Sequence, residues 1–317
     1  MNNKRLSQID AWRGFAIFCV ILYHSIIVYP INLQENNMLK SLYDYISVFN
    51  MPLFFFISGV CFSYKGNYRE YIIKKIKRIL IPYFSVSVLN FICKLVLPGL
   101  INKQVSIGSF ITDTLLYGGE YWFLYVMFIM LAIYPLINEL SNKTNKYLIE
   151  IVFIVLALLN VKTNILCMVP LLRYFAFFNT GYLLKETVIK NIDRNINIAI
   201  PLAILAVSIL LFVVNIKLDV RLIEMINAMI IIVATYMLIN NNLFINLFER
   251  YGMYSLQIYC LNGFLLVFAR TIICKLTSSA LIIIPFIVLI CLCISYVIIK
   301  YIIEKISIVR MLLGLQK

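Results

Sequence analysis

About ten stretches of roughly 20 mostly apolar residues recur along this chain of 317 residues, and they constrain its fold more than any other feature. Each is about long enough to cross the apolar core of a bilayer as a helix. They cover approximately 12–31, 46–64, 79–98, 121–139, 147–161, 165–184, 197–215, 222–240, 251–270 and 280–301. Helices and closed barrels are the structures that span a membrane, so stretches of this length predict an all-α, polytopic membrane protein. We expect a single transmembrane domain over residues 1–317.

The composition and the placement of charge agree with that class. The chain is 63% hydrophobic and 13% charged, with a mean hydropathy of +0.95, whereas a soluble domain is about half apolar and a quarter charged. The formal net charge of +14 comes from cations in short connectors between the apolar stretches. This pattern argues against nucleic-acid binding and is typical of the positive-inside bias of membrane proteins. With ten spans, it predicts that both termini are cytoplasmic.

Some connectors and helix ends carry local signals. The longest outer connector, 99–120, contains glycines typical of turns and enough apolar residues for a short helix, either re-entrant or interfacial. Pro52 in MPLFFFISG suits the first turn of the second span, and Gly59 allows close helix approach. The cysteines lie in or beside apolar runs without metal-ligand spacing, so we expect no disulfide and no metal site.

The first span contains two groups that a lipid-facing helix should not have, Arg13 and His24. Eleven residues of α-helix bring them to within about 20° of one face, about 16 Å apart along the axis. Ionisable groups inside a membrane usually face a protein interior or a watery cavity. His24, the only histidine, can exchange a proton near neutral pH and is the candidate general base. The alternative is a histidine that is hydrogen-bonded between helices for packing.

Cationic residues near the cytoplasmic side suggest an anion site. Asp10 precedes Arg13 by three residues, a spacing that allows an ion pair. The pair either lies at the membrane surface or orients Arg13 toward an anionic ligand. The run KKIKRILIPYF (74–84) contributes Lys75, Lys77 and Arg78, with Lys75 and Arg78 on one face of an α-helix. These cations either set the orientation in the membrane or bind a phosphate-bearing ligand that arrives from the cytosol.

Three further residues are candidates for a cavity or an acceptor site. Glu120, at the start of EYWFLYVMF, could bind a sugar hydroxyl, and Trp122 belongs either to that site or to an interfacial aromatic belt. Arg173 lies in the middle of the sixth apolar stretch, where a cation must pair with another group or line a cavity.

Taken in order, these segments resemble the membrane-bound acyltransferase 3 family, which includes bacterial O-acetyltransferases of surface polysaccharides and glycolipids. The resemblance covers nearly the whole chain. It rests on IDAWRGFAIFCVILYHS with its R-x10-H spacing, MPLFFFISG, the basic run before IPYF, YWFL, FFNTGYLL and YSLQIY. It implies about ten helices in the bacterial cytoplasmic membrane, and acyl transfer from cytosolic acetyl-CoA or another acyl-CoA to a hydroxyl presented on the far side.

The resemblance also implies residue roles. His24 would be the essential base, and Arg13 would aid the position of the donor or of His24. The cytoplasmic R-x-x-R motif of the family corresponds here to Lys75 and Arg78. Asn50 and Asn262 stand where relatives often carry further histidines, so His24 would have to act without a relay through those positions.

We therefore expect an O-acyltransferase that modifies a polysaccharide, oligosaccharide or glycolipid precursor of the cell envelope. CoA phosphates would bind near Arg13, Lys75, Lys77 and Arg78, with Asp10 orienting Arg13. Transfer would be direct or through an acyl-histidine. The expected partners are acyl-CoA, the acceptor and membrane lipid. No permanently bound cofactor is expected, and the oligomeric state is left open between a monomer and a homodimer. The rival class is a transporter or flippase of lipid-linked sugars, although its typical inverted halves are not evident.

Overall fold

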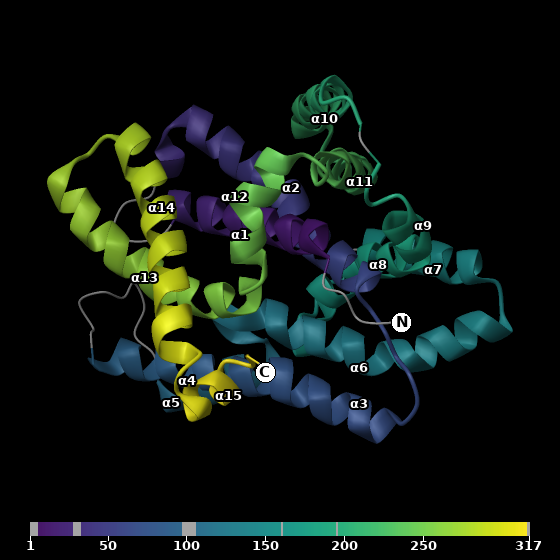
Figure 1. The fold of residues 1–317 in the computed structure, drawn as a ribbon, viewed down its shortest axis with the longest axis horizontal. Helices are drawn as coiled ribbons and strands as arrows, with labels where there is room; N and C mark the ends of the chain where they lie inside the picture. Colours follow the sequence, from purple (N-terminus) through teal and green to yellow (C-terminus); the bar gives the residue numbers. More distant parts are fainter. Residues whose placement is uncertain (1–5, 28–32, 97–105, 160, 195, 316–317) are drawn as a thin grey trace. The chain divides into compact units, whose positions relative to one another are not determined.

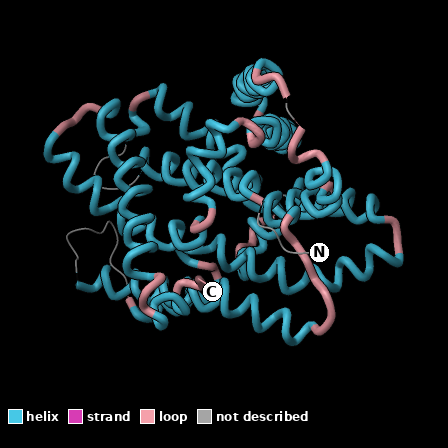
Figure 2. The backbone as a smooth tube through the Cα atoms, in the orientation of Figure 1, coloured by secondary structure: helices cyan, strands magenta, loops and turns pink. Residues whose placement is uncertain are grey.

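The structure is a computed structural model that describes residues 6–27, 33–96, 106–159, 161–194 and 196–315. The described residues form helices joined by turns, without a β-strand, which confirms the all-α prediction (Figure 2). The chain forms two compact units, which are described one at a time with the labels of Figure 1. Unit 1 contains Met1–Ile27, Asn32–Phe62 and Phe177–Ser255, and unit 2 contains Ser63–Ala176 and Leu256–Lys317.

Unit 1 is built around the first helix, α1. Its elements are α1 (Ser7–Ile27), η1 (Leu33–Glu35), α2 (Asn37–Val60), the second half of α8 (Met168–Leu183), α9 (Lys185–Lys190), α10 (Ala199–Leu218), α11 (Arg221–Leu238) and α12 (Asn242–Gly252). α1 packs along α12 and α2, α2 also packs against α11, and α10 pairs with α11. The helix that carries the candidate base is therefore enclosed by partners from the second span and from much later in the chain.

Glycines let the backbones of unit 1 approach closely. A Cβ atom on Gly252 would lie 1.6 Å from the Asp10 carbonyl oxygen, and one on Gly14 would lie 2.0 Å from a carbonyl oxygen of α12. At Gly59 a Cβ atom would lie 2.0 Å from the Phe178 carbonyl oxygen, which confirms the predicted close approach at this residue. Small residues at such crossings are the usual means of packing helices within a membrane.

Unit 2 contains the basic run and the aromatic start of the fourth predicted span. Its elements are α3 (Tyr68–Lys75), the π-helical η2 (Ile76–Leu80), α4 (Ile81–Val96), α5 (Ile107–Leu116), η4 (Gly119–Tyr121), α6 (Trp122–Lys143), α7 (Lys146–Leu158), η5 (Ile165–Cys167), the first half of α8, α13 (Ser255–Leu276), α14 (Ala280–Ile298), the π-helical η6 (Ile299–Ile303) and α15 (Ser307–Leu312). α3 and η2 pack against α6, and α15 packs against α4.

Within the described part of the chain, seven helical stretches are long and apolar enough to cross a membrane. They are Ser7–Ile27, Tyr68–Val96, Ile107–Ser141, Ala199–Leu218, Arg221–Leu238, Ser255–Leu276 and Ala280–Ile303. The three remaining predicted spans are also helical, as α2, α7 and α8. α7 and α8 have 13 and 16 residues, which is short for a span, and α2 carries Lys40 and Asp44 in its first half. The protein is therefore a multi-helix membrane protein.

The structure corrects the predicted place of Pro52 within its helix. Pro52 lies inside α2 and not in its first turn, because α2 already begins at Asn37. The side chain of Asn36 caps this start by accepting hydrogen bonds from the backbone N–H groups of Met38 and Leu39. An interior proline is tolerated in a membrane helix when neighbouring helices satisfy the freed backbone groups.

The short helix predicted in the connector 99–120 is α5, although residues 97–105 lie outside the described range. The buried hydroxyl of Tyr83 donates to the carbonyl oxygen of Thr114, near the end of α5, at 2.6 Å. Tyr83 is 13 residues before Val96, or about 20 Å along the helix axis. The end of α5 therefore lies alongside α4 and not at its tip, which favours the re-entrant alternative over the interfacial one.

Candidate functional site

The predicted pair at the start of α1 is present. Arg13 Nη1 donates to Asp10 Oδ1 at 3.5 Å, and the Asp10 side chain is only 2% exposed whereas that of Arg13 is 28% exposed. A buried carboxylate is costly unless it is paired, so the position of Asp10 depends on Arg13 and the surrounding polar groups. The low exposure of Asp10 argues against a loose surface pair and favours a fixed orientation of the guanidinium.

His24 lies three turns farther along α1 and is half-buried. Its ring meets the ring of Tyr23 edge to face, with centroids 5.1 Å apart and an interplanar angle of 83°. Tyr23 in turn stacks on Tyr43 of α2 at 4.2 Å, and the two hydroxyl groups are hydrogen-bonded. The position of His24 is thus constrained by a tyrosine pair that joins α1 to α2, a pair that the sequence analysis did not single out.

Trp12 fixes the rotation of α1 about its own axis. Its indole Nε1 donates to Thr235 Oγ1 at 3.0 Å, and its fully buried ring packs against Phe56 and Tyr236. Because Trp12 is next to Arg13, this anchoring limits the directions in which the guanidinium can point. The R-x10-H stripe is therefore held by packing on α2 and α11 as well as by its own ion pair.

Asn50 lies on α2, also in unit 1, and is 4% exposed. Its Oδ1 atom accepts a hydrogen bond from the Met51 N–H at 2.7 Å. An amide cannot take up a proton as an imidazole can, so this residue cannot act as a titrating relay.

The basic run of unit 2 is not a regular α-helix. The segment Ile76–Leu80 is π-helical, with Ile81 N–H bonded to the carbonyl oxygen of Ile76, so the α-helical spacing behind the predicted shared face of Lys75 and Arg78 does not apply. Lys75 is half-buried, with Nζ 5.0 Å from the centroid of the Tyr71 ring, whereas Lys77 and Arg78 are exposed. Single-turn π-helical insertions are frequent at functional sites.

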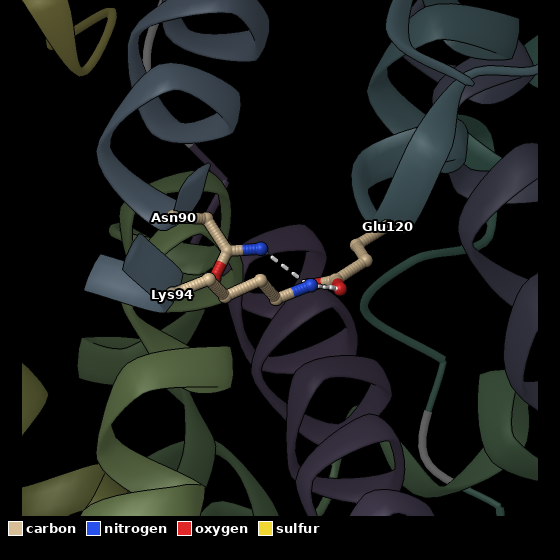
Figure 3. Close-up of polar contacts among 3 residues, drawn as sticks. All are labelled: Asn90, Lys94 and Glu120. Atoms are coloured by element: carbon tan, nitrogen blue, oxygen red, sulfur yellow. Dashed lines mark hydrogen bonds and ion pairs between the residues drawn. The ribbon is translucent and has the colours of Figure 1, made fainter. Parts of the chain in front are cut away.

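Glu120 lies at a polar cluster with two residues of α4 that were not predicted (Figure 3). The amide nitrogen of Asn90 donates to one carboxylate oxygen of Glu120, and the ammonium group of Lys94 pairs with the other. The Glu120 side chain remains 58% exposed and that of Lys94 24% exposed. The i, i+4 spacing of Asn90 and Lys94 was the signal in the sequence that could have indicated their common face.

An aromatic layer adjoins this cluster in unit 2. The ring of Trp122 lies nearly parallel to that of Tyr174, at 6.0 Å and 21°, and the rings of Tyr121 and Phe123 both meet that of Tyr259 edge to face. Arg173, the neighbour of Tyr174 on α8, is half-buried. Trp122 therefore belongs to a packed layer within the protein and does not stand alone at a surface.

Asn262 lies on α13 in the same unit and is 4% exposed. Its Oδ1 atom is buried without a hydrogen-bond partner among the described residues. The adjacent Gly263 faces Tyr121, since a Cβ atom there would lie 3.6 Å from the Tyr121 hydroxyl oxygen. Asn262 is therefore close in space to the segment that carries Glu120 and Trp122.

The turn before Glu120 is held by a strained segment that the sequence did not indicate. Leu166 and Cys167 adopt φ values of 55° and 54°, which are costly for residues with side chains. The Cys167 thiol donates to the Tyr117 carbonyl oxygen at 3.0 Å, and a Cβ atom on Gly118 would lie 2.5 Å from its sulfur atom. This contact fixes the turn from which Glu120 and Trp122 extend.

The predicted site residues divide between the units. Unit 1 carries Asp10, Arg13, His24 and Asn50, and unit 2 carries Lys75, Lys77, Arg78, Glu120, Trp122, Arg173 and Asn262. Of the second set, Glu120, Trp122 and Asn262 belong to one polar and aromatic region, and Arg173 is the chain neighbour of Tyr174, which stacks on Trp122. No three histidine, cysteine, aspartate or glutamate side chains in the described ranges converge as a metal site would require.

A family model described as an acyltransferase domain, that of acyltransferase 3, matches residues 6–302, nearly the whole chain. No curated protein and no solved structure matches significantly.

Proposed function

Because the chain belongs to the acyltransferase 3 family, which makes it a membrane acyltransferase, we propose that it is an O-acyltransferase. It moves an acetyl or other short acyl group from cytosolic acyl-CoA to a hydroxyl of a cell-envelope polysaccharide, oligosaccharide or glycolipid precursor. The observation that carries this proposal concerns α1: an ion pair with a buried carboxylate and the single histidine of the chain lie on this one helix of the matched region.

The proposed topology has ten spans, with both termini in the cytoplasm of a bacterium and the protein in its inner membrane. The seven long apolar stretches support it, as do the helices α2, α7 and α8 at the remaining predicted positions. The connectors that this topology places inside hold most of the lysines and arginines.

The reaction needs a base, since a neutral hydroxyl is a poor nucleophile. In the proposed step, an unprotonated ring nitrogen of His24 takes the hydroxyl proton while the oxygen attacks the thioester carbonyl. The C–S bond then breaks, the acyl group stays on the acceptor oxygen, and the imidazolium returns the proton to the CoA sulfur. In an acyl-histidine route, the ring nitrogen attacks the thioester carbonyl first, the C–S bond breaks and the CoA thiolate leaves. The acceptor oxygen then attacks the acyl carbon, the C–N bond to the ring breaks, and the hydroxyl proton passes to the thiolate.

The donor carries phosphates, and cations in each unit suit them. In unit 2, Lys77 and Arg78 are exposed on the π-helical segment, where they can pair with phosphate oxygens. In unit 1, Asp10 holds the Arg13 guanidinium, whose fork suits a phosphate better than an ammonium group would. The ammonium group of Lys75 lies over the Tyr71 ring, so we expect Lys75 to contribute less to phosphate binding than Lys77 and Arg78.

The acceptor is proposed to bind at the cluster of Glu120, Lys94 and Asn90 (Figure 3). Trp122 follows Glu120 by two residues and is included in this proposed site. Carboxylate, ammonium and amide groups together offer acceptors and donors for sugar hydroxyls. The buried and unpartnered Oδ1 atom of Asn262 offers one more acceptor in this region.

The test of this function uses the purified chain in lipid nanodiscs with acetyl-CoA. We expect CoA release that depends on an added glycan or glycolipid acceptor, together with an acetyl mass increment on that acceptor. The proposal is wrong if a panel of envelope glycans and glycolipid precursors takes up no acyl group. Movement of the lipid-linked sugar across the bilayer without acyl transfer would instead support the transporter alternative.

Substitution of Glu120 by glutamine is expected to raise the KM for the acceptor about fivefold to tenfold and to leave the KM for acetyl-CoA unchanged. The amide keeps the shape but removes the charge that pairs with Lys94 on this largely exposed side chain, and the expected change matches the loss of one hydrogen bond of typical net strength, about 0.5–1.5 kcal/mol. The measurement is a two-substrate kinetic analysis. Glu139→Gln is the matched control, because Glu139 forms a comparable pair with Lys143 at 2.9 Å on α6 away from the cluster. Equal acceptor KM values for the two variants would count against the acceptor site.

A further inference from the structure

The C-terminal turn of the chain packs against the segment that carries the exposed cations of unit 2. A Cβ atom on Gly314 would lie 2.3 Å from the Arg78 carbonyl oxygen and 2.7 Å from Pro82 Cγ. Gly314 is buried and has φ of +67°, so both its contacts and its backbone conformation favour glycine. The turn and the π-helical segment are therefore in direct backbone contact.

Pro82 explains why this contact falls at Arg78. In a regular α-helix the Arg78 carbonyl would accept from the N–H of the residue four positions later, but proline has no N–H to donate. The helix passes this point through the π-helical turn Ile76–Leu80, and Gly314 packs onto the same carbonyl group. The irregular backbone that presents Lys77 and Arg78 thus lies against the C-terminal turn.

A second contact holds the turn in place. Gln257 Nε2, on α13, donates to the Leu313 carbonyl oxygen at 2.9 Å, and the Gln257 side chain is 4% exposed. α15 packs against α4 and leads directly into Leu313 and Gly314. The connection therefore runs from α13 through Leu313 and Gly314 to the backbone of Arg78, all within unit 2.

We infer that the C-terminal turn is a positioning element for the donor, with Gly314 and Gln257 as positioning residues for the phosphate-binding cations Lys77 and Arg78. This inference rests on the proposed function. The family match ends at residue 302. By this inference, the turn at Leu313 and Gly314, beyond that point, also contributes to the affinity for an acyl-CoA. Neither residue is expected to touch the donor, because each acts through the backbone of the π-helical segment.

The test is Gly314→Ala in the full-length protein, measured by CoA binding and by two-substrate kinetics. We expect the Kd for CoA and the KM for acetyl-CoA to rise about tenfold, as misplacement of one or two cations would give. The values of kcat and of the acceptor KM are expected to stay close to those of the unmodified protein. A merely structural role would lower the amount of folded protein without this separation between donor KM and kcat.

Gly66→Ala is the matched control. Gly66 also has a positive φ, +79°, but a Cβ atom there would meet nothing within 4 Å, so the variant carries the backbone strain without the collision. It should bind CoA as the unmodified protein does. Equal CoA affinity for folded Gly314→Ala and for Gly66→Ala would overturn the inference.

Gln257→Met tests the same element from α13, since it keeps the length of the side chain and removes the donor to Leu313. If Gly314→Ala does not fold, the result for Gln257→Met decides. Weaker CoA binding by Gln257→Met then supports the inference, and unchanged CoA binding overturns it. CoA affinity is measured without turnover, so this result is separate from the proposed reaction. A protein that binds CoA but modifies no acceptor would contradict the proposed function alone.

Discussion

Replacement of His24 by glutamine is expected to lower kcat about a thousandfold, which is within the range that general-base catalysis contributes. Glutamine keeps a polar side chain of similar reach but cannot accept the proton of the acceptor hydroxyl. The edge-to-face contact with Tyr23 is a packing interaction that the substitution largely tolerates. The measurement is initial-rate acetyl transfer by purified protein in nanodiscs, at saturating acetyl-CoA and acceptor.

Chemical rescue separates a base from a packing histidine. In His24→Ala, added imidazole should restore part of the rate, because it can enter the vacated volume and accept the proton. Thermal unfolding of both variants checks that unit 1 remains folded. Transfer at the unmodified rate by folded His24→Gln, or a rate loss in His24→Ala that imidazole leaves unaltered, would contradict the assignment of His24 as the base.

Replacement of Gly252 by alanine is expected to destabilise the protein by about 3 kcal/mol or more, at the upper end of what overpacking costs. The added Cβ atom would lie 1.6 Å from the Asp10 carbonyl oxygen, and this neighbour is backbone that cannot rotate away. α1 and α12 would have to separate, which would also disturb the pair of Asp10 and Arg13. Unfolding in mixed micelles and the yield of monodisperse protein measure the effect.

Gly108→Ala is the control for this variant. Gly108 lies in the first turn of α5, and a Cβ atom there would meet nothing within 4 Å. The stability of the Gly108→Ala protein should therefore equal that of the unmodified protein or be slightly higher. If Gly252→Ala unfolds at the same denaturant concentration as Gly108→Ala, the close crossing of α1 and α12 is not present in the protein.

The helical class and the approximate positions of the helices could be predicted from the sequence, because the length and hydrophobicity of a span are local properties. The helix boundaries depended on capping groups. Asn36 caps the start of α2, so the helix begins at Asn37, nine residues before the apolar run that starts at 46. The apolar run does not indicate that these nine more polar residues are also helical. α12 is amphipathic and has only 11 residues, so a search for spans does not find it even though it is a main partner of α1.

The candidate site was predictable where its groups lie close together in the chain. Asp10 and Arg13 are three residues apart and pair as their spacing indicates. The partners of Glu120 could not be deduced in this way, since Asn90 and Lys94 are distant in sequence and meet it only through the path of α5. The π-helical turn before Pro82 was also missed, because apolar periodicity does not encode an i→i+5 bond.

The crossing of α1 and α12 has a consequence for biosynthesis. Domains generally form from the N-terminus as the ribosome proceeds at about 5–20 residues per second. α1 leaves the ribosome early, but Gly252 follows 225 residues after the end of α1 at Ile27, which corresponds to a delay of about 10–45 s. Throughout that interval the side of α1 that carries the Asp10 backbone carbonyl lacks the helix that packs against it. Nascent chains that stop before α12 should therefore be the natural substrates of membrane quality-control proteases.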